Sequence, residues 1–218
     1  MHIGCCFPRW EVDKGSRSLN SVDMATLGMI LPWMPKLREL SLNETGIYSA
    51  GVRALFAGLV RGSSQWPPLC YINLKYNNIG PSGAEALAAA LCKLPGLNIL
   101  NLSQNPFRDQ GMAALVTPLR KLPHLEELHI LQTDISDKGL DSLLANLSKD
   151  DFKWLDELEL FNDEVTEKGY AALASALVDG AMPKLRYLPL GDLGAQHAMA
   201  DKADALEARG IDGCTDLL

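Results

Sequence analysis

The sequence has no excess of basic residues. Its 218 residues include 20 lysines and arginines against 27 aspartates and glutamates, which gives a net charge of −7. The isoelectric point is near 5.1. Proteins that bind nucleic acid carry a basic surface that neutralises phosphate groups. We therefore expect no nucleic-acid partner and, for the same reason, no binding to an anionic membrane surface.

Long apolar runs are also missing. The first twenty residues contain no apolar segment of signal-peptide length. Nowhere does the chain contain the roughly 18 uninterrupted apolar residues that a transmembrane helix requires. These absences predict a protein with no membrane partner, located in the cytoplasm, with the nucleus as a further possibility.

Cysteine is sparse, and its number is odd. Irregular spacing does not fit a secreted disulfide framework, so reduced thiols in the cytosol or nucleus are expected. Near the N-terminus three residues could ligate a metal, but adjacent cysteines are not the spacing of a zinc site. Acylation of the adjacent cysteines is an alternative, although no glycine at position 2 supports it. The residues concerned are His2, Cys5, Cys6, Cys70, Cys92 and Cys214.

Catalytic motifs are absent as well. The chain has neither the G-x-S-x-G motif of a serine nucleophile nor a phosphate-binding loop. Glu126 and Glu127 are adjacent carboxylates, as are Asp150 and Asp151, but neighbouring strand residues point to opposite faces. No histidine has a second histidine or a cysteine four positions further along a helix. The sequence therefore predicts no enzyme activity, no cofactor and no metal site.

What the chain does contain is one pattern repeated along most of its length. The motif L-x-x-L-x-L recurs at intervals of 32, 28, 28, 30 and 30 residues, the last copy being partial. A period in this range predicts a solenoid in which each unit packs only on its neighbours. The copies begin at Leu37, Leu69, Leu97, Leu125, Leu155 and Leu185.

Each unit divides into two halves. In residues 97–102 the leucines alternate with polar residues near the motif's end, which predicts a short strand with one buried face. In the second half Leu87 and Leu91 lie four apart among alanines, which predicts a helix. Ser136 and Thr166 are placed as helix N-caps. We expect parallel strands with helices outside, and a strand core of Leu40, Leu42, Ile72, Leu74, Leu100, Leu102, Leu128, Ile130, Leu158 and Leu160.

The full pattern, L-x-x-L-x-L-x-x-N-x-I followed by G-x-x-x-L-x-x-x-L, resembles the ribonuclease-inhibitor subtype of leucine-rich repeat. The resemblance covers residues 37–193. It implies an α/β solenoid of about six repeats, with a curved parallel sheet inside and helices outside. It also implies that the asparagine at position nine bonds backbone groups in the turn after the strand. That position holds Asn77, Asn105, Thr45, Thr133 and Asp163 in the five full repeats.

The two ends depart from the repeat. Residues 1–18 carry no periodic pattern and are expected to be a disordered tail, followed by the solenoid over 19–195. Its first helix should bury Val22, Leu27, Ile30 and Leu31. We expect residues 196–218 to form a C-terminal helical cap, with one helix over 196–209 and a closing strand at 210–212. Pro189 suits an edge strand. No N-terminal cap is recognised, which leaves open a fragment of a longer protein.

Positions three, five, seven and eight of each unit should lie on the concave strand face. Aromatic residues there are typical interface anchors. The total number of such positions, about two dozen, fits a protein interface of standard size. Acidic residues there favour a basic partner. The alternative is that these positions merely tolerate any polar residue. The candidate binding residues are Glu39, Ser41, Glu44, Tyr71, Asn73, Lys75, Tyr76, Ile99, Asn101, Glu127, His129, Leu131, Glu157, Glu159, Phe161 and Tyr187.

We therefore predict a non-catalytic protein–protein interaction module that binds a basic protein through its concave face. Similar arrays occur in ribonuclease inhibitor, Nod-like receptors and Ran GTPase-activating protein, and they supply two alternatives. One is a GTPase activator, for which Lys75 or Arg108 could contribute a charge at the strand-end rim. The other is a structural scaffold or a fragment of a larger Nod-like receptor. The oligomeric state stays open, with a monomer as the simplest expectation.

Overall fold

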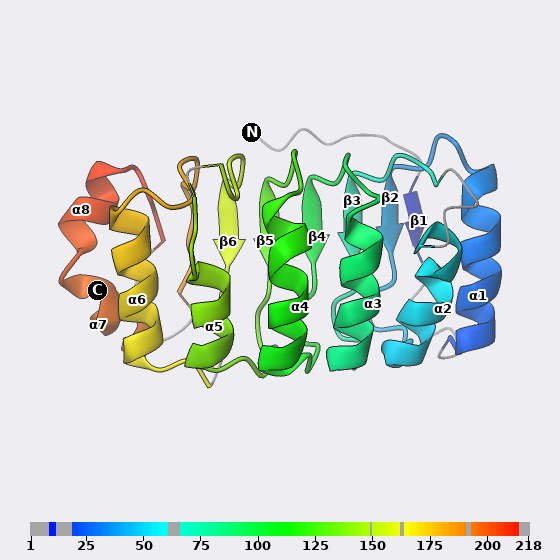
Figure 1. Cartoon of the computed structure of the whole chain (residues 1–218), viewed down its shortest axis with the longest axis horizontal. Helices are drawn as coiled ribbons and strands as arrows, with labels where there is room; N and C mark the ends of the chain where they lie inside the picture. Colours follow the sequence, from blue (N-terminus) through cyan, green and yellow to red (C-terminus); the bar gives the residue numbers. More distant parts are fainter. Residues whose placement is uncertain are drawn as a thin grey trace.

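The protein consists of one parallel sheet and one row of helices that covers a single face of it (Figure 1). The computed structural model describes residues 9–11, 19–60, 66–148, 150–161, 164–190 and 193–213. Its six strands lie in chain order, each parallel to the next. They are β1 (Arg9–Glu11), β2 (Glu39–Ser41), β3 (Tyr71–Asn73), β4 (Ile99–Asn101), β5 (Glu127–His129) and β6 (Glu157–Glu159).

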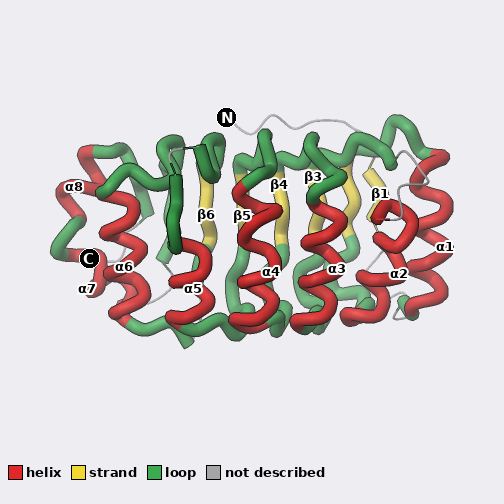
Figure 2. Tube along the Cα trace, viewed as in Figure 1, coloured by secondary structure: helices red, strands yellow, loops and turns green. Residues whose placement is uncertain are grey.

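Helices alternate with the strands and run beside one another along the molecule. Short strands and longer helices are joined by loops at the two edges of the layers (Figure 2). Within the described ranges, no helix combines the length and apolar character needed to cross a bilayer. The helices are α1 (Ser21–Ile30), η1 (Leu31–Trp33), α2 (Tyr48–Val60), α3 (Pro81–Leu91), α4 (Arg108–Arg120), α5 (Asp137–Leu144), α6 (Glu167–Val178), α7 (Leu193–Ala200) and α8 (Ala203–Ala208).

The core lies between the two layers, as the leucine spacing predicts. The middle residues of β2 to β6 stand opposite one another in the sheet register, so their side chains form one continuous apolar row. All ten strand residues expected in the core are buried, with exposed fractions of 0 to 2%. Leucines from the helices, such as Leu55, Leu87 and Leu115, close the core from the other side. The expected α/β solenoid, a parallel sheet covered by helices, is therefore confirmed.

Asn77 and Asn105 connect the turns of neighbouring repeats through hydrogen bonds. The Asn105 amide oxygen accepts hydrogen bonds from the backbone N–H groups of Asn77 and Ile79, both at 3.0 Å. Its amide nitrogen donates to the carbonyl oxygens of Leu74 and Leu102 at 2.8 and 2.9 Å. Asn77 repeats this arrangement one unit earlier. The backbone bonding that the resemblance implied is thus present. Asp163 lies outside the described residues.

The start of α5 is held against α4 by a carboxylate. Asp109 accepts hydrogen bonds from the backbone N–H of Ser136 at 2.9 Å and from its hydroxyl at 2.8 Å. Ser136 in turn caps the helix by accepting from the N–H of Lys138. A Cβ atom on Gly139 would lie only 2.6 Å from the same carboxylate, so any other residue there would displace it. The predicted N-cap at Ser136 is confirmed.

The next helix start repeats this contact. Asp137 accepts from the N–H and hydroxyl of Thr166 at 2.8 and 2.7 Å, and Thr166 caps α6. Burial of Asp137 would raise the pKa of its carboxyl group, but the hydrogen bonds from Thr166 and the charge of Lys168 outweigh burial and lower it. The predicted N-cap at Thr166 is confirmed, and the carboxylate that braces it is a feature that the sequence interpretation missed.

The N-terminal part differs from expectation in two ways. Residues Arg9–Glu11 form the edge strand β1, paired with β2, so a disordered tail is wrong for these three residues. The remainder of 1–18 lies outside the described residues. Of the four residues expected to be buried, Leu27 and Leu31 are buried, but Val22 and Ile30 are 71% and 41% exposed. Met24 is buried in addition. The helix is apolar on both sides, so its composition alone could not decide which side faces α2.

At the C-terminal end the sixth strand motif forms only single parallel bridges. Tyr187 pairs with Glu157 on one side and with Asp212 on the other. The ladder stops there because Pro189 has no backbone N–H to donate. The closing strand expected at 210–212 is likewise reduced to the bridge at Asp212. The single helix expected over 196–209 is two helices, α7 and α8.

Candidate functional site

Two rows of side chains cross the sheet on the face opposite the helices. Strand residues alternate between faces, so the first and third residue of each strand share this one. We define the strand face as these two rows, the residues that follow each strand, and Tyr187. Its rows are Glu39, Tyr71, Ile99, Glu127 and Glu157, and Ser41, Asn73, Asn101, His129 and Glu159. The predicted binding residues that follow the strands are Glu44, Lys75, Tyr76, Leu131 and Phe161.

Most of the predicted binding residues are half-buried rather than fully exposed. Glu44, Tyr76 and Tyr187 are exposed. Ser41 is 0% exposed, and its hydroxyl donates to the Asn43 amide oxygen at 2.9 Å. The prediction that Ser41 is available to a partner is therefore wrong, because its side chain is covered and its hydroxyl is bonded to Asn43.

The backbone turns sharply at position eight of the repeat, shortly after each strand ends. The eighth residue of four successive repeats adopts the left-handed conformation, with φ of 57° at Glu44, 59° at Tyr76, 57° at Gln104 and 49° at Gln132. Each of these N–H groups donates to the next repeat, as Tyr76 does to the Ser103 carbonyl at 3.0 Å. This turn presents the Tyr76 side chain outward, where it is 59% exposed.

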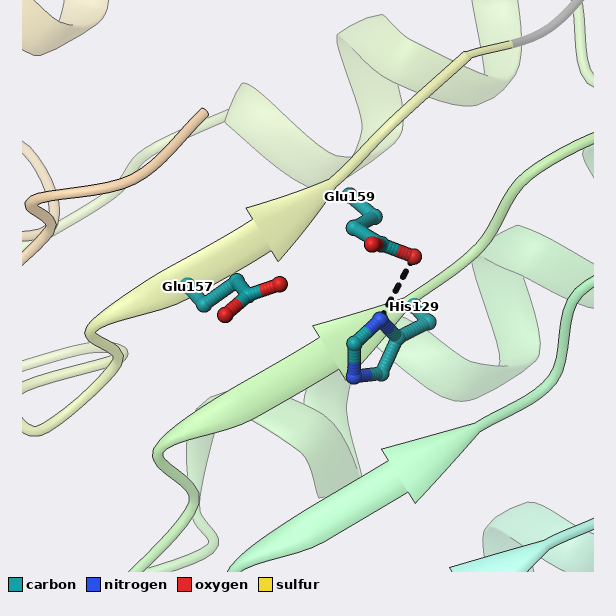
Figure 3. A group of neighbouring side chains, drawn as sticks. All are labelled: His129, Glu157 and Glu159. Carbon is teal, nitrogen blue, oxygen red and sulfur yellow. Dashed lines mark ion pairs between the residues drawn. The ribbon is translucent and has the colours of Figure 1, made fainter. Parts of the chain in front are cut away.

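A histidine lies among glutamates toward the C-terminal end of the strand face (Figure 3). His129 on β5 stands opposite Glu159 on β6 in the register, and Glu127 stands opposite Glu157. The Nδ1 atom of His129 lies 2.6 Å from a Glu159 carboxylate oxygen. Its Nε2 atom lies 3.5 Å from a carboxylate oxygen of Glu127. Both ring nitrogens therefore face a carboxylate.

The glutamates change the protonation of His129. Burial alone would lower the pKa of the imidazole, but hydrogen bonds to Glu127 and Glu159 and the charges of Glu159 and Glu157 outweigh burial and raise it to about 9. The hydrogen bond from His129, with the charges of His129 and Lys75, lowers the pKa of Glu159 against the effect of burial. Burial raises the pKa of Glu157, and Glu127, Glu159 and Asp156 add to this effect.

The predicted site residues fall into two groups on the sheet. Glu127, His129, Glu157 and Glu159 are brought together on β5 and β6, next to Tyr187. Tyr71 and Tyr76 belong to β3 and its turn, so β4 and β5 separate them from the strand that precedes Phe161. The Tyr71 hydroxyl accepts a hydrogen bond from the Asn73 amide at 3.1 Å. Aromatic side chains therefore lie in both parts of the face, whereas His129 and three of the glutamates gather on β5 and β6.

Comparisons with known proteins identify the repeats. The family model described as Leucine Rich repeat matches residues 68–88, 95–116 and 121–144. Among curated proteins, leucine-rich repeat-containing protein 45 of Gallus gallus is 32% identical over 83 residues, which are 38% of this chain and 12% of that protein. The chain thus spans about an eighth of the length of this relative. Among solved structures, the crystal structure of the TLR13–ssRNA13 complex aligns with a TM-score of 0.49 and 18% identity, over 84% of this chain and 26% of that one.

Three successive repeats of this chain match the leucine-rich-repeat model. The matched segments coincide with the units that contain β3, β4 and β5 together with helices α3, α4 and α5. With the parallel sheet and the alternating helices, they define an α/β leucine-rich-repeat solenoid.

Proposed function

We propose that the protein is a non-catalytic interaction module that binds a protein partner through the strand face. The observation that supports this most strongly is the register of the sheet, which aligns the variable side chains of five successive repeats into continuous rows. Such rows form one extended surface on rigid strands, and repeat proteins use surfaces of this kind for binding. We also infer that the repeats are of the ribonuclease-inhibitor-like subtype, because their intervals of 28 to 32 residues leave room for a helix in each unit.

The composition of the face supports a basic protein as the partner. Glu39, Glu127, Glu157 and Glu159 lie in the two rows, and Lys75 follows β3 at their edge. An acidic face attracts a basic surface and speeds its approach. It repels phosphate backbones, so the proposal excludes nucleic acid as the partner of this face. Exposed aromatic side chains such as Tyr76 and Tyr187 supply contact area.

The proposed module has no enzyme activity. The alternative function is a GTPase activator. An activator would require a charged side chain free to enter a GTPase site. Arg108 is the more exposed candidate, and its Nε atom lies 4.0 Å from a carboxylate oxygen of Asp134. Adding the protein to small GTPases and measuring GTP hydrolysis tests this point. We expect no acceleration, and acceleration that is lost on Arg108→Ala would contradict the proposal.

A capture experiment with matched variants tests the location of the binding face. The immobilised protein is compared with a strand-face variant, Tyr71→Ala with Tyr76→Ala, and with a helix-side variant, Glu85→Gln, on α3. Proteins retained by the wild type and by Glu85→Gln, but lost with the tyrosine variant, support the proposal. Identical retention by all three proteins would show that binding occurs elsewhere.

A further inference from the structure

We propose that His129, Glu157 and Glu159 form a binding site for a zinc ion on the strand face. One ligand atom from each of the three side chains lies within 4.8 Å of the other two. The three residues come from two adjacent strands, and their side chains project toward the same region (Figure 3). This site does not depend on protein binding, because the ligands all belong to one chain.

The strands hold these ligands in place. The Glu159 carbonyl accepts from the Ile130 N–H at 2.9 Å, and the His129 carbonyl accepts from the Leu102 N–H at 2.9 Å, so both backbones are fixed by the ladder. Zinc bonds to imidazole nitrogen and carboxylate oxygen are about 2.0–2.2 Å long, which places tetrahedral ligand atoms roughly 3.5 Å apart. Both glutamates are half-buried, and the ligand atoms start from separations of at most 4.8 Å.

The ring orientation assigns the ligand atom of His129. Nδ1 faces Glu159 at 2.6 Å, so a metal ion bound there replaces the proton that this pair shares. Nε2 keeps its hydrogen and faces Glu127 at 3.5 Å. A carboxylate on the second ring nitrogen of a metal-bound histidine fixes the ring and strengthens it as a ligand. Glu127 is therefore a positioning residue, and the three direct ligands leave one coordination position open.

The mixture of ligand types favours zinc over the alkaline-earth ions. Calcium and magnesium take oxygen ligands, whereas imidazole nitrogen suits zinc and the later first-row metals. Three carboxylates around a single imidazole also supply the negative charge that a divalent cation requires. We therefore expect millimolar calcium or magnesium to leave zinc binding unchanged.

Titration of the metal-free chain with zinc, followed by isothermal calorimetry, tests the site. Mildly alkaline pH is used because the His129 proton that zinc replaces is released more easily there. The decisive variant is Glu157→Gln, because Glu157 is a proposed ligand but not a partner in the His129 ion pairs. The matched control is Glu39→Gln, which neutralises another glutamate of the same row. Strands β3, β4 and β5 lie between Glu39 and Glu157. We expect Glu157→Gln to lower the affinity for one equivalent of zinc at least about tenfold. Glu39→Gln should bind zinc like the wild type.

Cysteine thiols elsewhere in the chain can also bind zinc, but they are unchanged in both variants, so the difference between the variants isolates the strand-face site. A second readout is the NMR signal of the His129 ring, which should shift with the first zinc equivalent that Glu157→Gln weakens. Equal zinc binding by wild type, Glu157→Gln and Glu39→Gln would overturn the proposal. So would a His129 ring signal that does not respond to zinc.

Discussion

At the scale of single residues, the strand face owes its electrostatic character to one imidazole among glutamates. His129 is held between Glu127 and Glu159, and the pKa of its ring is raised to about 9 from an ordinary value of 6.5. Its side chain is only 13% exposed, so solvent screens these contacts weakly. The glutamates that we propose to attract a basic partner therefore also fix the charge of the histidine.

The first prediction follows from this raised pKa. The folded protein binds the proton more tightly than the unfolded chain, so the contribution to stability is complete below pH 6.5 and is lost as pH rises through about 9. In the presence of a metal chelator, chemical denaturation should show a loss of about 1–3 kcal/mol over this window. Glu159→Gln should remove most of this pH dependence. An equally steep loss in Glu159→Gln would assign the effect to another group.

The second prediction concerns Asn105, whose amide group is buried and bonds the backbone of two repeats. Asn105→Ala leaves several buried N–H and C=O groups without partners, so it should lower the free energy of unfolding by at least about 2 kcal/mol. Asn98→Ala is the control, because that side chain is partly exposed and donates to the Glu126 carboxylate at 3.2 Å. Equal losses for the two variants in urea denaturation would contradict the proposed role of Asn105.

At the scale of elements, the helices are braced against each other at their starts. Asp109 and Asp137 each accept two hydrogen bonds from the capping residue of the following helix. These contacts link α4 to α5 and α5 to α6 where α5 and α6 begin. The solenoid is thus held by polar bonds at the edge of its helix layer as well as by apolar packing between the layers.

The third prediction tests this bracing. A methyl group at position 139 would meet the Asp109 carboxylate at 2.6 Å and the Ile135 Cβ at 3.0 Å. Gly139→Ala should therefore destabilise the protein by about 1–3 kcal/mol through overpacking, although alanine favours helices. Gly96→Ala is the control, because its new methyl group would lie 3.7 Å from the nearest backbone oxygen. A higher melting temperature for Gly139→Ala would show that the helix starts can move apart.

The elements themselves could be predicted from the leucine spacing, because each repeated position is buried by the same neighbours in the next repeat. Leu100 and Leu102 are buried for that reason. β1 could not be predicted, because a three-residue edge strand depends on the open hydrogen-bonding groups of β2 and not on its own side chains. The break between α7 and α8 carries no proline or glycine signal either.

The candidate site could be predicted in part. The rows of the strand face follow from the period, because equal positions in successive repeats stand opposite one another. The ion pair of His129 with Glu159 could have been found by aligning residues 127–129 with 157–159. The burial of Ser41 could not, because the equivalent residues of the other repeats are only half-buried. The left-handed turn at position eight could not either, because Glu, Tyr and Gln occupy it rather than glycine.

At the scale of the whole molecule, the two ends of the solenoid differ. The C-terminal end is covered by α7 and α8, with Met199, Leu206 and Ile211 buried. Arg209 fastens this part by donating to the carbonyl oxygens of Ala181 and Met182 at 3.2 and 3.3 Å. At the other end, the apolar outer side of α1 is exposed at Val22 and Met29.

The fourth prediction concerns the proposed cap. Removing residues 196–218 deletes these buried side chains and exposes the apolar surface of α6 that they cover. Exposed apolar surface of this kind promotes association. Light scattering should show a larger particle for the truncated chain than for the full chain at equal concentration. A truncated chain that keeps the same mass and melting temperature would exclude a capping role for this segment.

The central claim is that the strand face binds a protein partner, and two tyrosines allow a direct measurement. Tyr76 and Tyr48 are 59% and 56% exposed, and both have a left-handed backbone, but only Tyr76 belongs to the strand face, whereas Tyr48 begins α2. With the captured partner, surface plasmon resonance should show that Tyr76→Ala weakens binding by about 2 kcal/mol or more, roughly thirtyfold. Tyr48→Ala should bind like the wild type. Full affinity in Tyr76→Ala together with a loss in Tyr48→Ala would place the binding site on the helix side and contradict the account.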